Sequence, residues 1–163
     1  MASAYHVGVN PSPFLPVGFR CCGIHAGFKS RPEHLDLALI VAEAPCSAAG
    51  VFTRNHFPGE PVKLARERLR GGKLQALIIN SRISNVGTGA RGRAQAEAVC
   101  ESLSRQLGIA SELSLISSTG IIGRPYPEGV FERAIPKALS QLGQSEEHLM
   151  CAARAIMTTD TVP

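Results

Sequence analysis

The sequence predicts a chain of the α/β class, and three observations lead to that prediction. Short continuous apolar segments, typical of buried strands, alternate with segments whose apolar residues recur at helical spacing. Glycine or proline stands at most junctions between them. The composition, 44% hydrophobic and 18% charged over 163 residues, is that of a globular protein about the size of one ordinary domain. We therefore expect one compact unit in which strands and helices alternate.

The first half is expected to form strands around one short helix. Residues 1–17 are expected to be an extended lead, rich in proline toward its end. The helix begins at Pro61 and ends at Leu69, before two glycines, because proline is favoured at the first helical position and glycine just past the last. The predicted strands are residues 37–42, residues 49–53, paired with them across a turn at 44–47, and residues 74–80.

The second half alternates a long helix, a short strand and two further helices. Gly108 follows the long helix and supplies its end. Pro136 must lie in the first turn of the next helix or kink it. Ser145 is the expected N-cap of the last. These predicted elements are helices at residues 90–107, 131–142 and 146–157 and a strand at 113–116.

Charge and hydropathy argue against nucleic-acid and membrane partners. The net charge is +4, and the densest basic cluster would spread around a helix rather than form one stripe, so we expect it to be solvated. No apolar run approaches the roughly 20 residues that span a bilayer, and the amino terminus lacks a cationic start and an apolar segment. We expect a cytoplasmic protein. The basic cluster comprises Lys63, Arg66, Arg68, Arg70 and Lys73.

The five cysteines and five histidines show no metal-ligand spacing, so we expect reduced thiols and no metal.

A glycine-rich motif between a predicted strand and a predicted helix suggests a ligand site. Residues Gly87–Gly92 satisfy the pattern G-x-G-x-x-G between a strand and a helix, as in dinucleotide-binding units. However, Gly87 lies seven residues beyond Asn80, and the next strand ends in serines rather than in an acidic residue. A nucleotide- or phosphate-binding module using Gly87–Gly92 is retained as an alternative.

The stretch "SLISSTGIIGRPYP", residues 114–127, runs from a strand into a turn rich in hydroxyls and glycine. The carboxyl end of a strand is where α/β sheets usually place ligands, and glycines let a ligand approach the main chain. Such a turn can aim a hydroxyl and an N–H at one point, which is how an oxyanion hole is built. The run Thr158–Thr161 after the last predicted helix adds further hydroxyls. The chain offers no recognisable nucleophile beside these donors.

Three runs resemble the amino-terminal half of the ornithine acetyltransferase family, also called bifunctional glutamate N-acetyltransferase. The likeness extends from about Gly18 to the end of the chain. Its most specific parts are the later two runs, in this order and spacing. The runs are "DLALIVAEAPCSAAGVFTRNHFPGEPVKLARERL" (residues 36–69), "STGIIGRPYP" (118–127) and "AARAIMTTDTVP" (152–163).

The resemblance implies a fold of mixed sheets layered with helices and a self-cleaving precursor, whose β chain begins with the nucleophilic threonine. Residues 18–163 would be the α-chain portion, ending before the cleavage site and therefore catalytically silent alone. Thr119 and Gly120 would form the oxyanion hole and Thr158 would contact the substrate. The implied reaction moves an acetyl group from N-acetylornithine to glutamate without a cofactor, with acetyl-CoA as a possible co-substrate. The implied partner is the β chain, in an α2β2 assembly.

One segment departs from the family pattern. The family usually reads N-S-G-N-A-N-A-C-T-G where this chain reads "NSRISNVGTG", residues 80–89. Arg82 and Ile83 stand where a glycine and an asparagine are usual, and an arginine there is strained if the backbone has positive φ. This difference leaves open a second interpretation, a paralogue of secondary metabolism that acts on another amino acid.

Overall fold

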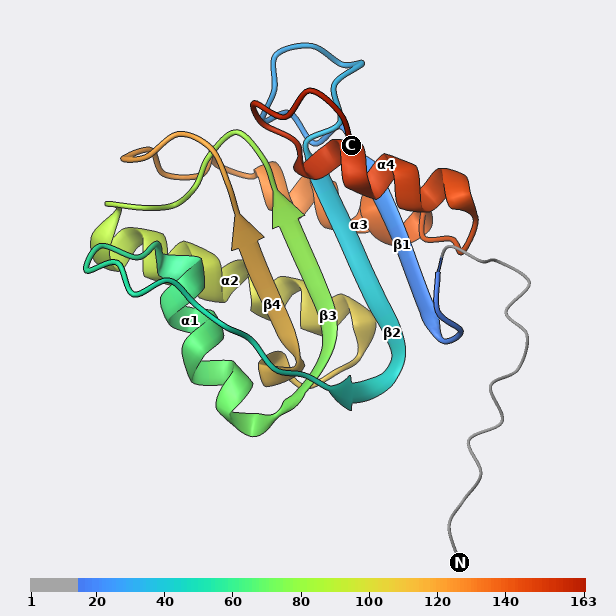
Figure 1. Cartoon of the computed structure of the whole chain (residues 1–163), viewed down its shortest axis with the longest axis horizontal. Helices are drawn as coiled ribbons and strands as arrows, with labels where there is room; N and C mark the ends of the chain where they lie inside the picture. Colours follow the sequence, from blue (N-terminus) through green and yellow to red (C-terminus); the bar gives the residue numbers. More distant parts are fainter. Residues whose placement is uncertain (1–14) are drawn as a thin grey trace, which may run out of the picture.

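The computed structural model describes residues 15–163, which form a four-stranded mixed sheet with helices on both faces (Figure 1). The strand order follows the chain, β1-β2-β3-β4. β1 and β2 are antiparallel, as are β2 and β3, whereas β3 and β4 are parallel and joined through a helix. The strands are β1 (Phe19–Ile24), β2 (Leu37–Ser47), β3 (Lys73–Asn80) and β4 (Ser114–Ser118).

Helices α2 and α3 cover one face of the sheet, and α4 covers the β1–β2 half of the other (Figure 1). Helix α1 lies beside α2 and the edge strand β4. None of the helices within residues 15–163 is long and apolar enough to cross a membrane. The helices are α1 (Glu60–Arg68), α2 (Gly89–Leu107), α3 (Val130–Ser140) and α4 (Glu146–Ile156), with short 3-10 turns at Leu69–Gly71 and Ser111–Leu113.

Successive side chains of β2 point to opposite faces of the sheet and therefore join two separate buried clusters. Leu37, Leu39 and Val41 face α2 and α3, where they join the larger buried cluster. Ala38, between two of them, faces α4 and packs with Ala152. Because both faces of its first part are covered, residues 37–42 form a continuous apolar run, which is why the sequence predicted a strand there.

The sequence prediction is wrong for the region around β2. Residues 49–53 form no strand, and the expected turn at 44–47 is the end of β2 itself. The pairing with β3 shifts between Val41 and Cys46, so the extra residues around Pro45 are absorbed as an irregularity in one long strand. Val51 is fully exposed, with no neighbouring strand to cover it. β2 pairs instead with β3 on one side and with β1 on the other, and the β1 sequence FRCCGI lacks the apolar periodicity of a strand.

The other predicted elements are confirmed, with ends shifted by a few residues. The Ser145 hydroxyl accepts a hydrogen bond from the His148 amide as the N-cap of α4. Pro136 lies in the interior of α3 rather than in its first turn, on the exposed side of the helix. The basic cluster is not uniformly solvated, because Arg68 donates to the carbonyls of Ser111 (2.6 Å) and Ser114 (2.7 Å). Of the expected extended lead, residues 1–14 lie outside the described residues.

Candidate functional site

Four segments gather at the end of the sheet where β3 and β4 finish (Figure 1). They are the loop between β1 and β2, the loop from β3 to α2, the loop from β4 to α3, and the residues after α4. The predicted oxyanion residues and Thr158 lie on two of them. The other two determine how those segments are held.

The turn after β4 leaves two hydrogen-bond donors free. The Thr119 amide donates to the Asn80 carbonyl over 3.1 Å and so continues the pairing of β3 with β4. The Thr119 hydroxyl and the Gly120 amide have no acceptor within residues 15–163. Thr119 is half-buried and Gly120 is exposed, so a small molecule can reach both donors.

Gly120 packs directly against the main chain of Arg82. Its φ is 126°, in the region that favours glycine, and a Cβ there would fall 2.7 Å from the Arg82 Cα atom and closer still to the Arg82 carbonyl. The Ile121 amide then donates to the Arg82 carbonyl over 2.9 Å. The position of the Gly120 amide is therefore set by close contact with a neighbouring segment.

Arg82 itself has φ 87° and is exposed. This confirms that the backbone at residue 82 takes a conformation that favours glycine. A non-glycine residue in the left-handed region costs about 1–2 kcal/mol. Arg82 thus occupies a strained position on the rim of the candidate site.

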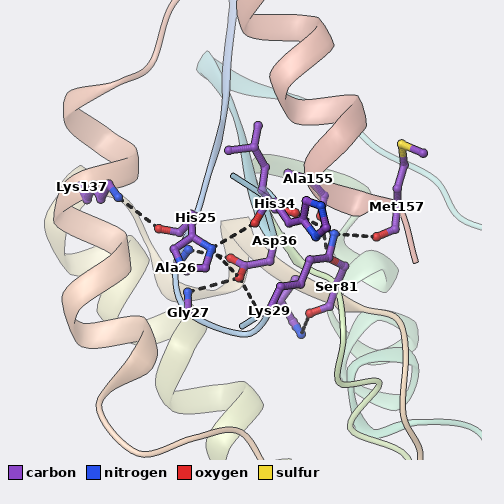
Figure 2. Close-up of polar contacts among 12 residues, drawn as sticks. His25, Ala26, Gly27, Lys29, His34, Asp36, Ser81, Lys137, Ala155 and Met157 are labelled. Atoms are coloured by element: carbon purple, nitrogen blue, oxygen red, sulfur yellow. Dashed lines mark hydrogen bonds and ion pairs between the residues drawn. The ribbon is translucent and has the colours of Figure 1, made fainter. Parts of the chain in front are cut away.

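Hydrogen bonds from Ser81 and Lys29 hold the end of α4 and the residue that follows it (Figure 2). The Ser81 hydroxyl donates to the carbonyl of Ala155 over 2.7 Å. The Lys29 ammonium donates to the carbonyls of Met157 (2.9 Å) and Leu35 (2.7 Å). Thr158 follows directly; it is exposed, and its amide donates to the Asp160 carboxylate over 2.9 Å. Ser81 therefore holds the end of α4 while its neighbour Arg82 supports Gly120.

Asp36 organises the loop between β1 and β2 (Figure 2). Its side chain is completely buried and accepts from the amides of Ala26 (2.6 Å), Gly27 (3.2 Å) and Lys29 (2.8 Å). His25 lies 3.3 Å from the same carboxylate through Nδ1. Burial is the main cause that lowers the pKa of Lys29; Asp36 opposes this shift, and the charge of Arg82 adds to it. A buried carboxylate thus fixes the loop that carries Lys29 to Met157.

Packing within the chain, rather than a ligand, accounts for a glycine of the G-x-G-x-x-G motif at Gly87–Gly92. Gly92 lies in the first turn of α2, and a Cβ there would overlap the side chains of Thr88 and Asn85, so the glycine lets the helix pack against the loop before it. The Thr88 hydroxyl bonds to Asn85 (2.5 Å) rather than capping α2. Nothing in this geometry requires a nucleotide.

The ArgJ family model matches residues 20–163. The chain belongs to the ArgJ family. It is 42% identical over 147 residues to the arginine biosynthesis bifunctional protein ArgJ of Thermosynechococcus vestitus, with 90% of this chain and 34% of that protein covered. It is 40% identical over 152 residues to the mitochondrial ArgJ of Penicillium rubens, with 91% and 31% covered. The chain thus spans about a third of the length of the curated relatives it matches.

Solved ArgJ structures share the fold. The ornithine acetyltransferase of Mycobacterium tuberculosis, solved in complex with ornithine, superposes with a TM-score of 0.88 at 36% identity, covering 92% of this chain and 80% of that one. The ArgJ protein of Bacillus halodurans gives a TM-score of 0.84 at 36% identity, covering 90% and 75%. The mixed sheet with its helices is therefore the amino-terminal part of the ArgJ fold.

The sequence predicted Thr119, Gly120 and Thr158 as site residues, but it did not predict the residues that hold these segments in place. Thr119 and Gly120 lie together, whereas Thr158 follows the end of α4 that Ser81 holds at Ala155. Within the described residues no hydrogen bond joins Thr158 to the other two. Lys29 and Asp36 were missed, although an aspartate directly before an apolar strand was visible as a signal for a buried charge.

Proposed function

We propose that this chain is the α-chain part of an acetyltransferase, in which Thr119 and Gly120 bind the acetyl oxygen. One observation carries the proposal: the Thr119 amide is used by Asn80, whereas the Thr119 hydroxyl and the Gly120 amide remain as two adjacent donors at a strand end. Fixed donors of this kind stabilise the negative charge that develops when an acyl carbonyl is attacked. The similarity to the Mycobacterium tuberculosis protein, an ornithine acetyltransferase solved with ornithine, supports the reaction class.

The proposed reaction has two steps. The hydroxyl of an amino-terminal threonine on the β chain attacks the acetyl carbonyl of N-acetylornithine, forming an oxyanion that the two donors hold. The intermediate expels the ornithine amine, which takes up the proton that the threonine hydroxyl lost, and leaves an acetyl ester on the threonine. The amine of glutamate then attacks the ester carbonyl and forms N-acetylglutamate, and the C–O bond to threonine breaks as a proton passes from the amine to the threonine oxygen. Thr158 would contact the amino-acid part of the substrate.

The partners and setting are part of the same proposal. The β chain of the same precursor supplies the nucleophile, and two such αβ units pair as α2β2. No cofactor is needed, and acetyl-CoA is a candidate second donor. The protein is expected in the cytoplasm, although some fungal relatives are named as mitochondrial.

The test uses the complete gene product with N-acetylornithine and glutamate. We expect acetylglutamate to form and an acetyl group to appear on an amino-terminal threonine when glutamate is withheld. Transfer to a different amino acid in a panel of acceptors would favour the paralogue. Absence of any transfer, together with saturable nucleotide binding that Gly87→Val abolishes, would favour the phosphate-binding alternative.

A further inference from the structure

Tyr126, in the loop between β4 and α3, contacts the last residue of β4. Its hydroxyl lies 2.6 Å from the Ser118 hydroxyl, and its side chain is 3% exposed. We propose that Tyr126 is a positioning residue that acts through Ser118 and Asn80 to hold the Thr119 and Gly120 donors in place. This inference rests on the function proposed for that turn.

The hydrogen bonds from Tyr126 run in one direction. The Ser118 hydroxyl donates to Oδ1 of Asn80 over 2.6 Å, and the Asn80 side-chain nitrogen donates to the Ile83 carbonyl over 2.8 Å. A serine hydroxyl has a single proton, which Ser118 gives to Asn80. Tyr126 is therefore the donor in its contact with Ser118, and the chain starts at Tyr126 and ends at Ile83.

This chain spans both sides of the candidate site. Asn80 receives the Ser118 hydroxyl on its side chain and the Thr119 amide on its carbonyl. Ile83, at the end of the chain, pairs with Ile121 on the other side of Gly120. The residues before and after Gly120 are thus both fixed by groups that the Tyr126 hydroxyl orients.

The Tyr126 ring is held independently of its hydroxyl. It packs edge-on against Phe131 at 5.0 Å and Phe28 at 6.4 Å between ring centroids. A phenylalanine at this position keeps these contacts and removes only the hydroxyl, with its hydrogen bonds to Ser118 and Asn85. Tyr126→Phe therefore tests the hydroxyl at the start of the hydrogen-bond chain without disturbing the ring.

Ser114 offers a matched control at the opposite end of the same strand. It is completely buried, and its hydroxyl bonds to Ser104 (2.8 Å) and to the Cys100 carbonyl (3.0 Å). Ser114→Ala removes a hydrogen-bonded buried hydroxyl from β4, as Tyr126→Phe does from the loop that follows it, but far from the turn at Thr119. A general loss of stability will affect both variants.

The first measurement is acetyl transfer by the complete gene product. We expect Tyr126→Phe to lower kcat about five- to tenfold, the worth of about one neutral hydrogen bond, and to change KM for the donor by less than about twofold. Ser114→Ala should keep the wild-type kcat. An unchanged kcat in Tyr126→Phe, or equal losses in the two variants, would overturn the proposal.

The second measurement is amide hydrogen exchange at Thr119 and Ile121, the two hydrogen-bonded amides on either side of Gly120, and it does not depend on activity. Exchange at these amides should become about tenfold faster in Tyr126→Phe and stay unchanged in Ser114→Ala. If the wild-type protein transfers no acetyl group, the proposed function fails, and exchange alone decides the positioning role. Equal exchange in wild type and Tyr126→Phe would then overturn it.

Discussion

The amide of Thr119 donates to the carbonyl of Asn80 over 3.1 Å, and this bond decides which donors remain in the turn after β4. An oxyanion hole at Thr119 built from its main-chain amide is excluded while that bond holds. The donors left are the side-chain hydroxyl of Thr119 and the main-chain amide of Gly120. The predictions for these two residues therefore differ in kind.

Gly120→Ala should nearly abolish acetyl transfer. A Cβ at this position overlaps the Arg82 backbone, so the turn must shift and the Gly120 amide moves with it. Loss of one oxyanion donor costs about 3–4 kcal/mol in the transition state, which corresponds to a fall in kcat of about 10²–10³-fold. Steady-state kinetics with N-acetylornithine, together with donor binding to the variant, measure the effect.

Gly123→Ala is the control for backbone strain. Gly123 also has positive φ, at 78°, but a Cβ there meets no atom within 4 Å. The substitution should cost about 1 kcal/mol of folding free energy and leave kcat within about twofold of wild type. Equal kinetic losses in the two glycine variants would contradict a specific role for Gly120.

Thr119→Val should lower kcat by about 10²-fold, because the hydroxyl is the donor that Thr119 has left. Valine keeps the branched shape of the side chain and leaves the amide bond to Asn80 intact. Thr119→Ser, which retains the hydroxyl, should recover most of the activity. A valine variant as active as the serine variant would remove Thr119 from the oxyanion hole.

The sequence predicted most of this architecture because its buried strands and capped helices have strong local signals. The apolar run of β2 and the Ser145 cap depend on neighbours in the chain, and both are confirmed. β1 could not be found in this way, because its place in the sheet comes from pairing with β2 rather than from its own residues. The supports of the site are similarly non-local: Ser81 bonds to Ala155, 74 residues later. A hydroxyl-rich turn can be recognised in the sequence as a source of hydrogen-bond donors. The contacts that hold those donors in place come from residues far away in the chain and cannot be recognised in this way.

Arg82→Gly should stabilise the fold by up to about 1 kcal/mol. Glycine removes the cost of a left-handed backbone at φ 87°, and part of that gain is offset by its greater freedom in the unfolded chain. Removing the Arg82 charge also relieves its repulsion of Lys29. Urea denaturation measures the change. Arg124→Gly, at a residue without positive φ, should lower stability instead, and a gain in both variants would point to a cause other than backbone strain.

Tyr126 should make the fold less stable in alkaline solution. Burial raises the pKa of its phenol from 10.0 to about 12, and its hydrogen bonds with Ser118 and Asn85 oppose the shift only in part. Between these two values the unfolded chain has lost the proton that the folded chain keeps. The contribution of Tyr126 is therefore fully present below pH 10 and lost as the pH rises toward 12, by up to about 1.4 kcal/mol per pH unit.

Unfolding measured across this pH range in wild type and Tyr126→Phe isolates the effect from that of other groups. The stability of wild type relative to the variant should fall steadily above pH 10. A constant difference between the two proteins would show that the phenol is not protected from ionisation.

Asp36→Asn should destabilise the fold by about 2–4 kcal/mol and loosen the residues around Thr158. The carboxylate accepts three main-chain amides in a fully buried position, and an asparagine can present only one oxygen to them. At least one buried amide is then left without an acceptor and faces a side-chain NH₂ group. Because the same loop carries Lys29, the bond from Lys29 to Met157 weakens with it.

Urea denaturation measures the loss of stability, and amide exchange at residues 157–160 measures the loosening. The exposed Asp160 provides the control for stability, since Asp160→Asn should change the free energy of unfolding by less than about 0.5 kcal/mol. If Asp36→Asn were no more harmful than Asp160→Asn, the loop between β1 and β2 would have to be held by something other than this carboxylate.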